Sequence, residues 1–407
     1  MCRMQDSGIK WLGQIPIEWG TIRFKYLHNG LNTGESIDKE FWSNDENDAT
    51  FYTAGIEPIR TNYDSFPEWK FTRENDLLLA RNGTPYVYLP SISACYTDHI
   101  IRANMKTGIN RRYVRYSLQQ SISSEVVGGV SLATWSASLW NEQIIPWPNA
   151  KIQAQIVNYL DAKCARIDAV IEQTRASIED YKKLKQSVIT QAVTKGIRLN
   201  RPMKDSRIPW IHSCPQDWEE CRIKNAVFPI EKPVLPTDEI ITCFRDGEVT
   251  LRKNRREDGF TISFTEHGYH GVDIGDLVIH GMDAFAGAIG CSDSRGKTTP
   301  VVHVCETIGN NRYFMYYLRS LAFGNILMDL SNGVRIRSSD FRNFQKLGVF
   351  GVLVPPRKEQ DEIVDYLDDK IEKIDKLLSE KEKLLHELRT YKQSVIYEFV
   401  TGKKLCN

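Results

Sequence analysis

Four groups of residues have side chains and surroundings that would suit contact with nucleic acid. Arginine and lysine bind phosphates and guanine edges, asparagine and glutamine bind adenine edges, and loops carry these side chains into a groove. The groups are Arg81, Asn82 and Thr84; Arg252, Lys253, Arg255 and Arg256; His267 and His270; and Arg335 and Arg337. Each group lies close to a glycine or a proline, which is typical of turns and loops.

The four groups predict different kinds of contact. The first follows an apolar stretch and suits base reading, whereas the second is a basic run that suits phosphates. The fourth alternates two arginines with apolar residues, as in a strand edge that faces DNA. The histidines of the third group suit groove contact or simple solvation, because further metal ligands are not close in sequence. For the other groups the alternative is a solvated turn or charge run.

Motifs for catalysis are missing from the sequence. It contains no G-x-x-x-x-G-K-[ST] loop for binding phosphates and no Asn/Asp-Pro-Pro-aromatic tetrapeptide for adenine methylation. The small-residue segment 284–290 is not followed by a helical pattern, so it predicts a tight turn between strands rather than a cofactor loop. We therefore expect a binding protein without catalytic residues and without a bound cofactor.

Composition limits the possibilities further. A chain of 407 residues with 41% hydrophobic residues exceeds one core and predicts at least two domains. The net charge of +1 gives no general basic excess, so nucleic-acid binding must rest on local features. The 9 cysteines form no C-x-x-C pair, which favours reduced thiols over a metal site. Without a long apolar run or a signal pattern, we expect a cytoplasmic protein that does not contact membranes.

The chain contains an internal repeat. Residues 151–195 align without a gap with 358–402, and roughly 17 of about 45 positions are identical. A second repeated motif pairs Trp11, Pro16 and Trp19 with Trp210, Pro215 and Trp218. Tryptophans at such equivalent positions predict core anchors of a shared frame. The segments between these markers barely resemble each other, which is the pattern of two modules that read different targets.

Both repeated segments predict long helices. Pro148 and Pro355-Pro356 precede them, neither contains an internal glycine or proline, and Gly196 and Gly402 lie near their ends. Apolar residues form a narrow seam of coiled-coil width. The seam residues are Leu160, Ile167, Ile171 and Ile178, and Leu367, Ile371, Ile374, Leu378 and Leu385. We expect an antiparallel coiled coil within the chain; the alternative is that each helix packs only on its own domain.

Outside these helices the patterns predict mixed α/β (α+β) domains. Short strands are expected at 77–80, 86–89, 277–279, 301–304 and 347–354, and helices at 113–119 and 313–321. The expected organisation is two mixed domains separated by two long antiparallel helices, with a pseudo-twofold internal repeat. The boundaries are 1–150 for the first domain, 151–200 for the central helical region, 201–356 for the second domain and 357–407 for the C-terminal helical region.

These motifs resemble those of the specificity subunit of type I restriction–modification systems. The resemblance rests on Pro355–Asp368 with Ile374-Asp375, the weaker copy that begins at Pro148, Asp76-Leu77 before Arg81-Asn-Gly83, and Ile15–Trp19. It covers essentially the whole chain. A proline, Glu-Gln and Ile-x-x-Tyr-Leu leading into a seamed helix, present twice in one chain, is a specific signal.

The resemblance implies a host-defence protein with two target-recognition domains, each reading half of a split site in double-stranded DNA. The long helices would separate the half-sites and dock two modification (methyltransferase) subunits. Those partners would use S-adenosylmethionine, and restriction subunits would add translocation and cleavage with ATP and Mg. This chain would be a non-catalytic subunit with no cofactor and no metal of its own.

The sequence departs from the repeated pattern at two places. Ile152 stands where the second copy has Glu359, so docking there can differ. In the second domain 280–283 replaces the turn that contains Arg81, so a role of Arg81 cannot be carried over. Two alternative functions remain, a standalone DNA methyltransferase or nuclease specificity protein and a coiled-coil scaffold that binds proteins.

Overall fold

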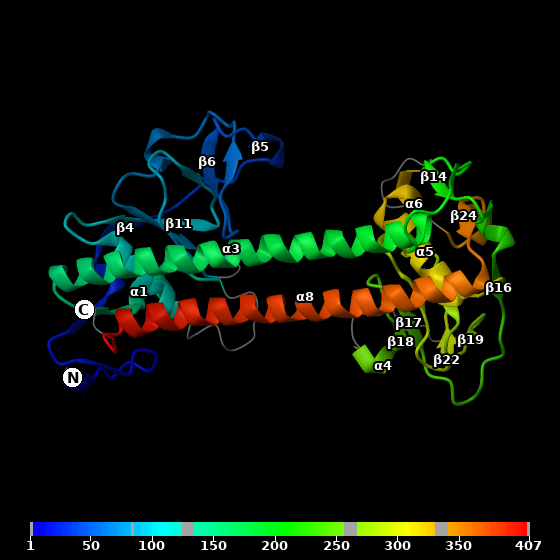
Figure 1. The fold of residues 1–407 in the computed structure, drawn as a ribbon. Helices are drawn as coiled ribbons and strands as arrows, with labels where there is room; N and C mark the ends of the chain where they lie inside the picture. The colour runs from blue at the N-terminus through cyan, green and yellow to red at the C-terminus, as the bar shows by residue number, and fades with distance from the viewer. Residues whose placement is uncertain (1–2, 83–84, 124–133, 256–266, 330–340, 405–407) are drawn as a thin grey trace. The chain divides into compact units, whose positions relative to one another are not determined.

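The structure is a computed structural model that describes residues 3–82, 85–123, 134–255, 267–329 and 341–404. The chain divides into two compact units, which are unit 1 (Met1–Arg175 and Lys383–Asn407) and unit 2 (Ala176–Glu382). The long helices α3 (Ala150–Lys195) and α8 (Arg357–Val400) are each divided between the units, with one segment in unit 1 and one in unit 2 (Figure 1).

Each unit begins its globular part with the same hairpin, here called the leading hairpin. In unit 1, β1 (Met4–Asp6) pairs with β2 (Gln14–Pro16), and in unit 2, β13 (Met203–Asp205) pairs with β14 (Ser213–Pro215). Trp19 and Trp218 follow these hairpins and are buried, while Trp11 and Trp210 pack partly buried on the same cores. The prediction that the four tryptophans are core anchors is confirmed.

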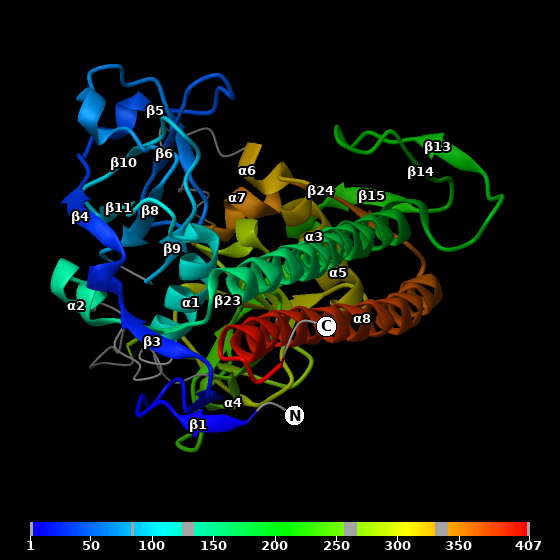
Figure 2. The same cartoon turned by 90° about the vertical axis from the view of Figure 1, so that its left-hand side faces the viewer.

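The central sheet of unit 1 is antiparallel, with the strand order β4-β11-β8-β9 (Figure 2). Its strands are β4 (His28–Thr33), β8 (Asp76–Ala80), β9 (Val87–Tyr88) and β11 (Ile100–Met105). Every residue of β8 is buried, and helix α1 (Arg111–Ser123) contributes Val114 and Leu118 to the core on one face of this sheet. The strand predicted at 77–80 is confirmed, and it lies within β8, one of the two interior strands of the sheet.

Unit 2 has a central sheet of the same order, β16-β23-β20-β21. Its strands are β16 (Val227–Ile230), β20 (Leu277–His280), β21 (Ile289–Cys291) and β23 (Val302–Thr307). Helix α5 (Asn311–Phe323) corresponds to α1 and presents a run of buried aromatic and aliphatic residues to the core. The two central sheets and their covering helices therefore form a common frame.

The remaining elements differ between the units. Unit 1 has a second sheet, β10-β6-β7-β5, in which β10 (Cys95–Tyr96) and β6 (Ala49–Tyr52) are parallel and β7 (Ile59–Thr61) and β5 (Trp42–Ser43) complete the order. Unit 2 has two antiparallel pairs instead, β17 (Ile241–Cys243) with β18 (Val249–Leu251) and β19 (His270–Val272) with β22 (Gly296–Thr298), and a parallel bridge between Ile240 and Lys297 joins them.

Smaller elements connect the frame to the long helices. The pairs are β3 (Gly20–Arg23) with β12 (Ile144–Trp147), and β15 (Glu219–Arg222) with β24 (Gly351–Val354). The short helices are α2 (Ala137–Glu142), α4 (Arg252–Arg255), α6 (Ile326–Asp329) and α7 (Phe344–Gly348). The predicted strand 347–354 is therefore partly wrong: its start belongs to α7, because the Asn343 side chain accepts the backbone N–H of Gln345 at 3.0 Å and begins a helical turn.

Helices α3 and α8 begin and end where the sequence predicts. In each first turn a glutamine side chain donates back to a proline carbonyl, Gln153 to Pro148 and Gln360 to Pro355, both at 2.9 Å. Gly196 and Gly402, with φ of 75° and 71°, end the helices in the left-handed conformation that glycine adopts without strain.

The turn at 284–290 also matches its prediction. Residues Ala284–Ala286 form a 3-10 turn that ends at Gly287, whose φ is 94°, and β21 follows. Seven described cysteines are free, and the described ranges hold no group of three metal-ligating side chains. Among the described residues no helix is long and apolar enough to cross a membrane.

Candidate nucleic-acid interface

In unit 1, the Arg81-Asn82 turn leaves the central sheet at the end of β8. The backbone of Arg81 is held on both sides, because its N–H donates to the His99 carbonyl at 2.8 Å and its carbonyl accepts the Trp135 N–H at 2.7 Å. Its side chain is exposed. An exposed charged side chain on a backbone held by hydrogen bonds is well placed to reach a ligand.

Asn82 is partly buried and contacts a residue that the sequence did not single out. Its Nδ2 lies 2.7 Å from Nδ1 of His99, whereas its buried Oδ1 has no partner among the described residues. The His99 side chain is half-exposed. Asn82 is therefore held against His99, and the half-exposed His99 joins it as a candidate contact; no motif in the sequence links these two positions.

The equivalent turn of unit 2 has the same backbone contacts and no side chain. The N–H of Gly281 donates to the Val301 carbonyl at 2.9 Å, and its carbonyl accepts the Phe341 N–H at 2.7 Å. A Cβ at Gly281 would lie 2.7 Å from the Val301 oxygen and 3.1 Å from backbone atoms of Arg342. This position cannot present an arginine without a backbone shift, in agreement with the departure seen in the sequence.

In unit 2, the basic run lies on the one-turn helix α4. Lys253 Nζ is 2.7 Å from a Glu239 carboxylate oxygen, and Arg255 pairs with Asp246 at 2.6 Å and with Glu248 at 2.9 Å. Arg252 is tied to the neighbouring hairpin, since its Nε donates to Oγ1 of Thr242 at 3.4 Å. Two of the predicted phosphate contacts are thus ion-paired within the same unit.

The two histidines of the third group occupy different environments. His270 begins β19, and its Nε2 lies 2.9 Å from the Val302 carbonyl, so this ring takes part in holding the sheet region together. His267 is exposed beside Gly268 and remains available to a ligand. Four of the predicted contact residues lie outside the described residues, namely Thr84, Arg256, Arg335 and Arg337.

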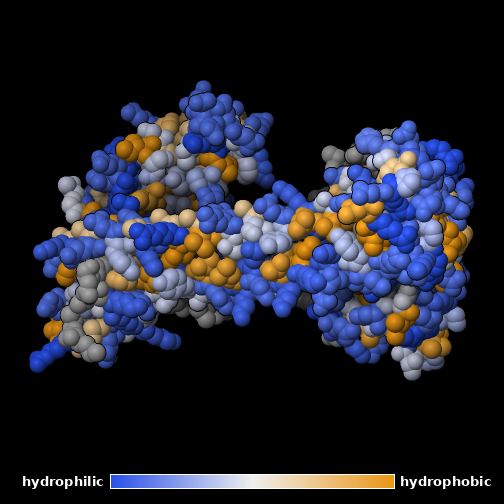
Figure 3. Space-filling view, in the orientation of Figure 1, coloured by the Kyte–Doolittle hydropathy of each residue, from blue (hydrophilic) through white to orange (hydrophobic). Residues whose placement is uncertain are grey.

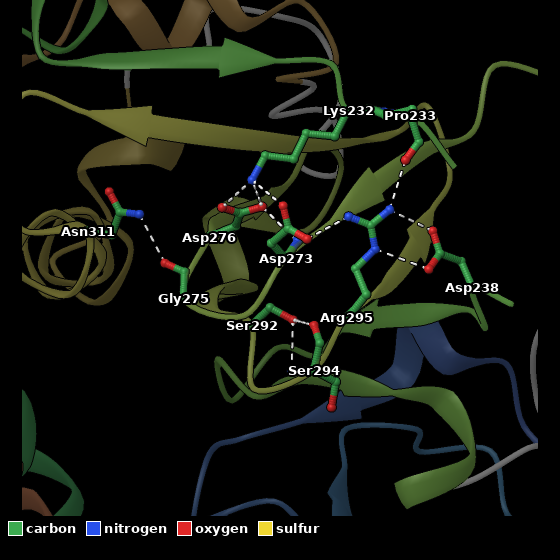
Figure 4. Close-up of polar contacts among 10 residues, drawn as sticks. All are labelled: Lys232, Pro233, Asp238, Asp273, Gly275, Asp276, Ser292, Ser294, Arg295 and Asn311. Atoms are coloured by element: carbon green, nitrogen blue, oxygen red, sulfur yellow. Dashed lines mark hydrogen bonds and ion pairs between the residues drawn. The ribbon is translucent and has the colours of Figure 1, made fainter. Parts of the chain in front are cut away.

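An ion-pair network next to α4 was not foreseen from the sequence (Figure 4). Arg295 donates to Asp238 at 2.8 Å, to Asp273 at 2.5 Å and to the Pro233 carbonyl at 2.8 Å, while Lys232 binds Asp273 and Asp276. The hydrogen bond from Arg295 holds the pKa of Asp238 below its usual range, and Lys232 followed by Arg295 does so for Asp273. The network ties the 232–239 segment to β19 and β22.

The predicted helix seam is largely protected from solvent. Leu160 and Leu367 are fully buried in the cores of units 1 and 2 respectively, and Ile371 packs partly buried on the core of unit 2. Ile167, Ile171, Ile178 and Ile374 are each at most 7% exposed, whereas Leu378 and Leu385 are half-buried.

The segments of α3 and α8 contact each other within each unit, and the contacts are equivalent. In unit 1, Lys392 of α8 pairs with Asp168 of α3 at 2.6 Å, and in unit 2, Lys185 of α3 pairs with Asp375 of α8 at 2.6 Å. The repeat aligns Lys185 with Lys392 and Asp168 with Asp375, so one ion pair occurs twice with the roles of the helices exchanged. In unit 2, Tyr181 faces Lys381 while Lys185 faces Asp375, which makes these segments antiparallel.

A repeated aspartate fixes each long helix to its globular part. Asp161 accepts from the Tyr116 hydroxyl at 2.8 Å and pairs with Arg112 at 2.6 Å. In unit 2 the equivalent set is Asp368 with the Tyr316 hydroxyl and Arg312, both at 2.6 Å. In the sequence, the signal for these contacts is the shared Arg-Tyr-x-x-Tyr pattern at 112–116 and 312–316.

No family model and no curated sequence matches the chain, whereas solved structures do. A chain solved in work on complex assembly and conformational transition of the type I R-M system matches with a TM-score of 0.62 and 13% identity, over 95% of this chain and 98% of that chain. The HsdS subunit from Thermoanaerobacter tengcongensis matches with a TM-score of 0.44, 14% identity and coverage of 96% and 98%. The type I S subunit from M. genitalium matches with a TM-score of 0.41, 16% identity and coverage of 94% and 96%.

Only the first of these likenesses is strong enough to compare folds. It extends over nearly the full length of both chains, so it includes both units of this protein. The chain therefore has the fold of a chain from a type I restriction–modification system, and the resemblance carried by its sequence motifs is confirmed at the level of the fold.

Proposed function

We propose that this chain is the DNA-specificity subunit of a type I restriction–modification complex. It binds a split site in double-stranded DNA through two recognition domains, within 1–150 and 201–356, and reads one half-site with each. The helical regions 151–200 and 357–407 form an antiparallel coiled coil that separates the domains. The chain itself is non-catalytic, and methylation, translocation and cleavage belong to its partner subunits in the cytoplasm.

The observation that carries this proposal is a common frame with divergent additions. Both units have the same leading hairpin, the same order of central strands and the same aspartate contact to a long helix. Beyond the central sheets, unit 1 forms one four-stranded sheet that includes β5, whereas unit 2 forms two pairs joined by a parallel bridge and includes β19. A shared frame suits one mode of approach to DNA, and different outer elements suit two different base sequences.

Exposed apolar side chains on the long helices support docking of one kind of partner at two places (Figure 3). Three equivalent pairs of positions are at least 36% exposed in both copies. The pairs are Tyr159 and Tyr366, Val170 and Leu377, and Leu184 and Tyr391. Apolar residues left exposed at equivalent positions favour two copies of the same modification subunit.

Methylome sequencing of a host that carries the complete system tests the proposal. The expected result is methylated adenine in a motif of two half-sites separated by a nonspecific spacer. Exchange of 201–356 for the same region of a related subunit should change one half-site and keep the other. A continuous motif, or two half-sites changed at once, would count against the division of reading between the units.

A further inference from the structure

The basic residues of α4 are neutralised by carboxylates from its own unit. Lys253 and Arg255 make three ion pairs of 2.6 to 2.9 Å with Glu239, Asp246 and Glu248. The side chains of all five residues are between 36% and 54% exposed, so solvent and ligands reach the ion pairs. Exposed ion pairs of this kind contribute little to stability, which leaves another use for them open.

The turn that carries Asp246 and Glu248 is held in place by contacts with α5. Asp246 and Glu248 lie in the turn between β17 and β18, and the partly buried Arg319 of α5 donates to the Asp246 backbone carbonyl. A Cβ at Gly247 would collide with the Arg319 guanidinium, so this turn and Arg319 are closely packed. The turn is therefore attached to the frame of unit 2.

Glu239 is held by a different set of contacts. Its carbonyl accepts the Lys297 N–H of β22 at 2.9 Å, and its neighbour Asp238 is bound by Arg295 (Figure 4). The three carboxylates thus come from two segments, each held by its own hydrogen bonds, and they meet at α4. The Arg255 guanidinium also stacks 4.1 Å from the centre of the Phe244 ring, which orients it towards Asp246.

We infer that Glu239, Asp246 and Glu248 act as built-in substitutes for DNA phosphates on Lys253 and Arg255. In the DNA-free chain the three carboxylates are paired with the two cations, an arrangement here called the mask. When DNA binds, its phosphates replace the carboxylates. This inference rests on the proposed function, since it requires DNA to be the ligand of α4. It makes the three carboxylates specificity-determining residues that do not touch a base.

The physical consequence concerns nonspecific DNA. A cation that is already paired gains less from a phosphate, and the released carboxylate takes up a counterion while the phosphate loses one. Nonspecific binding, which depends on such charge contacts alone, is therefore weakened. Binding of cognate DNA also includes base contacts, so the carboxylates reduce its binding free energy by a smaller fraction. The mask thus raises discrimination against nonspecific DNA, and it agrees with a net charge of only +1.

The test compares the complete subunit with a triple variant, Glu239→Gln, Asp246→Asn and Glu248→Gln. The probe is a duplex of about 30 base pairs without the methylated motif, and the dissociation constant is measured over a series of KCl concentrations. We expect about three- to tenfold tighter nonspecific binding and a salt dependence steeper by about one to two ions. The matched control is Glu219→Gln, Glu231→Gln and Glu306→Gln, which removes three exposed carboxylates elsewhere in the same unit.

A second variant keeps the test decisive. Adding Lys253→Ala and Arg255→Ala to the triple variant should remove the gain, because the unmasked cations are then absent. Equal tightening in the triple variant and its control, or a gain that survives loss of the two cations, would overturn the mask. Failure of the wild-type complex to methylate any split motif would instead refute the proposed function, so the two failures are distinguishable.

Discussion

The two turns that leave the central sheets show how one frame supports two surfaces. Arg81 and Gly281 have the same backbone partners, an N–H to the neighbouring strand end and a carbonyl to a buried aromatic residue. One position carries an exposed guanidinium, whereas the other has no room for a Cβ. The backbone hydrogen bonds at this position are thus the same in both units, whereas the side chain differs. The two units can therefore bind different ligands with the same fold.

The long helices provide the strongest test of this division between frame and readout. Four residues inserted after Ser177 lengthen α3 by about 6 Å and turn it by about 40°, close to one or two base pairs of DNA. We expect a methylated motif with both half-sites unchanged and a spacer longer by one or two base pairs. Two inserted residues turn the seam to the opposite side and should abolish assembly with the modification subunits.

Methylome sequencing and co-purification measure these outcomes. A changed half-site with an unchanged spacer would show that the helices do not set the distance. The substitution Ser177→Ala, which leaves the length of α3 unchanged, is the control for local disturbance of the helix.

The next largest effect concerns the start of α8, where the two helices differ. Glu359 is buried, pairs with Arg201 and accepts the Trp218 indole N–H at 3.2 Å, whereas its counterpart in α3 is Ile152. Glu359→Ile leaves Arg201 with the exposed Asp217 as its remaining ionic partner and the Trp218 indole N–H without an acceptor, and it should cost about 3 kcal/mol in the free energy of unfolding of unit 2.

Denaturant unfolding with a probe in unit 2 measures that cost. Glu362→Ile is the matched control, because its partner Arg198 is half-exposed and an exposed ion pair contributes little to stability. Equal effects of the two substitutions would mean that the buried pair is no more than a surface ion pair in energy.

Exchanges at the two sheet turns should separate readout from stability. Arg81→Ala and Asn82→Ala are each expected to cost about 1–3 kcal/mol in affinity for the cognate duplex if they contact base edges, with the thermal stability unchanged. Gly281→Ala should instead lower the stability of unit 2, because its Cβ meets backbone atoms. Affinity for cognate and noncognate duplexes and the melting temperature are the measurements.

The pattern of loss distinguishes the kinds of contact. A base contact relaxes specificity at one position of a half-site, whereas a phosphate contact weakens binding to all sequences alike. If neither Arg81→Ala nor Asn82→Ala changes affinity, this turn is not part of the interface and its equivalence to Gly281 concerns the frame alone.

The smallest expected effect is a difference in acid sensitivity. The pKa values of Asp238 and Asp273 are held low by Arg295 and Lys232 in unit 2. Their contribution to stability is present above the unfolded-state pKa, about 3.9, and is lost as the pH falls through the lower folded-state values. Hydrogen exchange should therefore show the 232–239 segment opening below about pH 4, and Arg295→Gln should lessen the pH dependence of this opening.

Much of the frame could be predicted from the sequence because it depends on local, periodic patterns. The proline before each long helix, the seam spacing and the glycine after it determine where α3 and α8 begin and end. The apolar runs at 77–80 and 277–279 become interior strands since only burial on both faces suits them. The repeat itself predicted that two similar units exist.

Only the tertiary structure decided which charges are free to bind. Arg81 and Arg255 were both predicted to contact DNA, yet one side chain is exposed on a hydrogen-bonded backbone and the other is paired with two carboxylates. His99 joined Asn82, and Arg295 joined Asp238, across distances in sequence that no motif spans. Ion pairs and hydrogen bonds of this kind depend on which strands become neighbours, whereas helix ends and buried strands depend on the residues next to them in the chain.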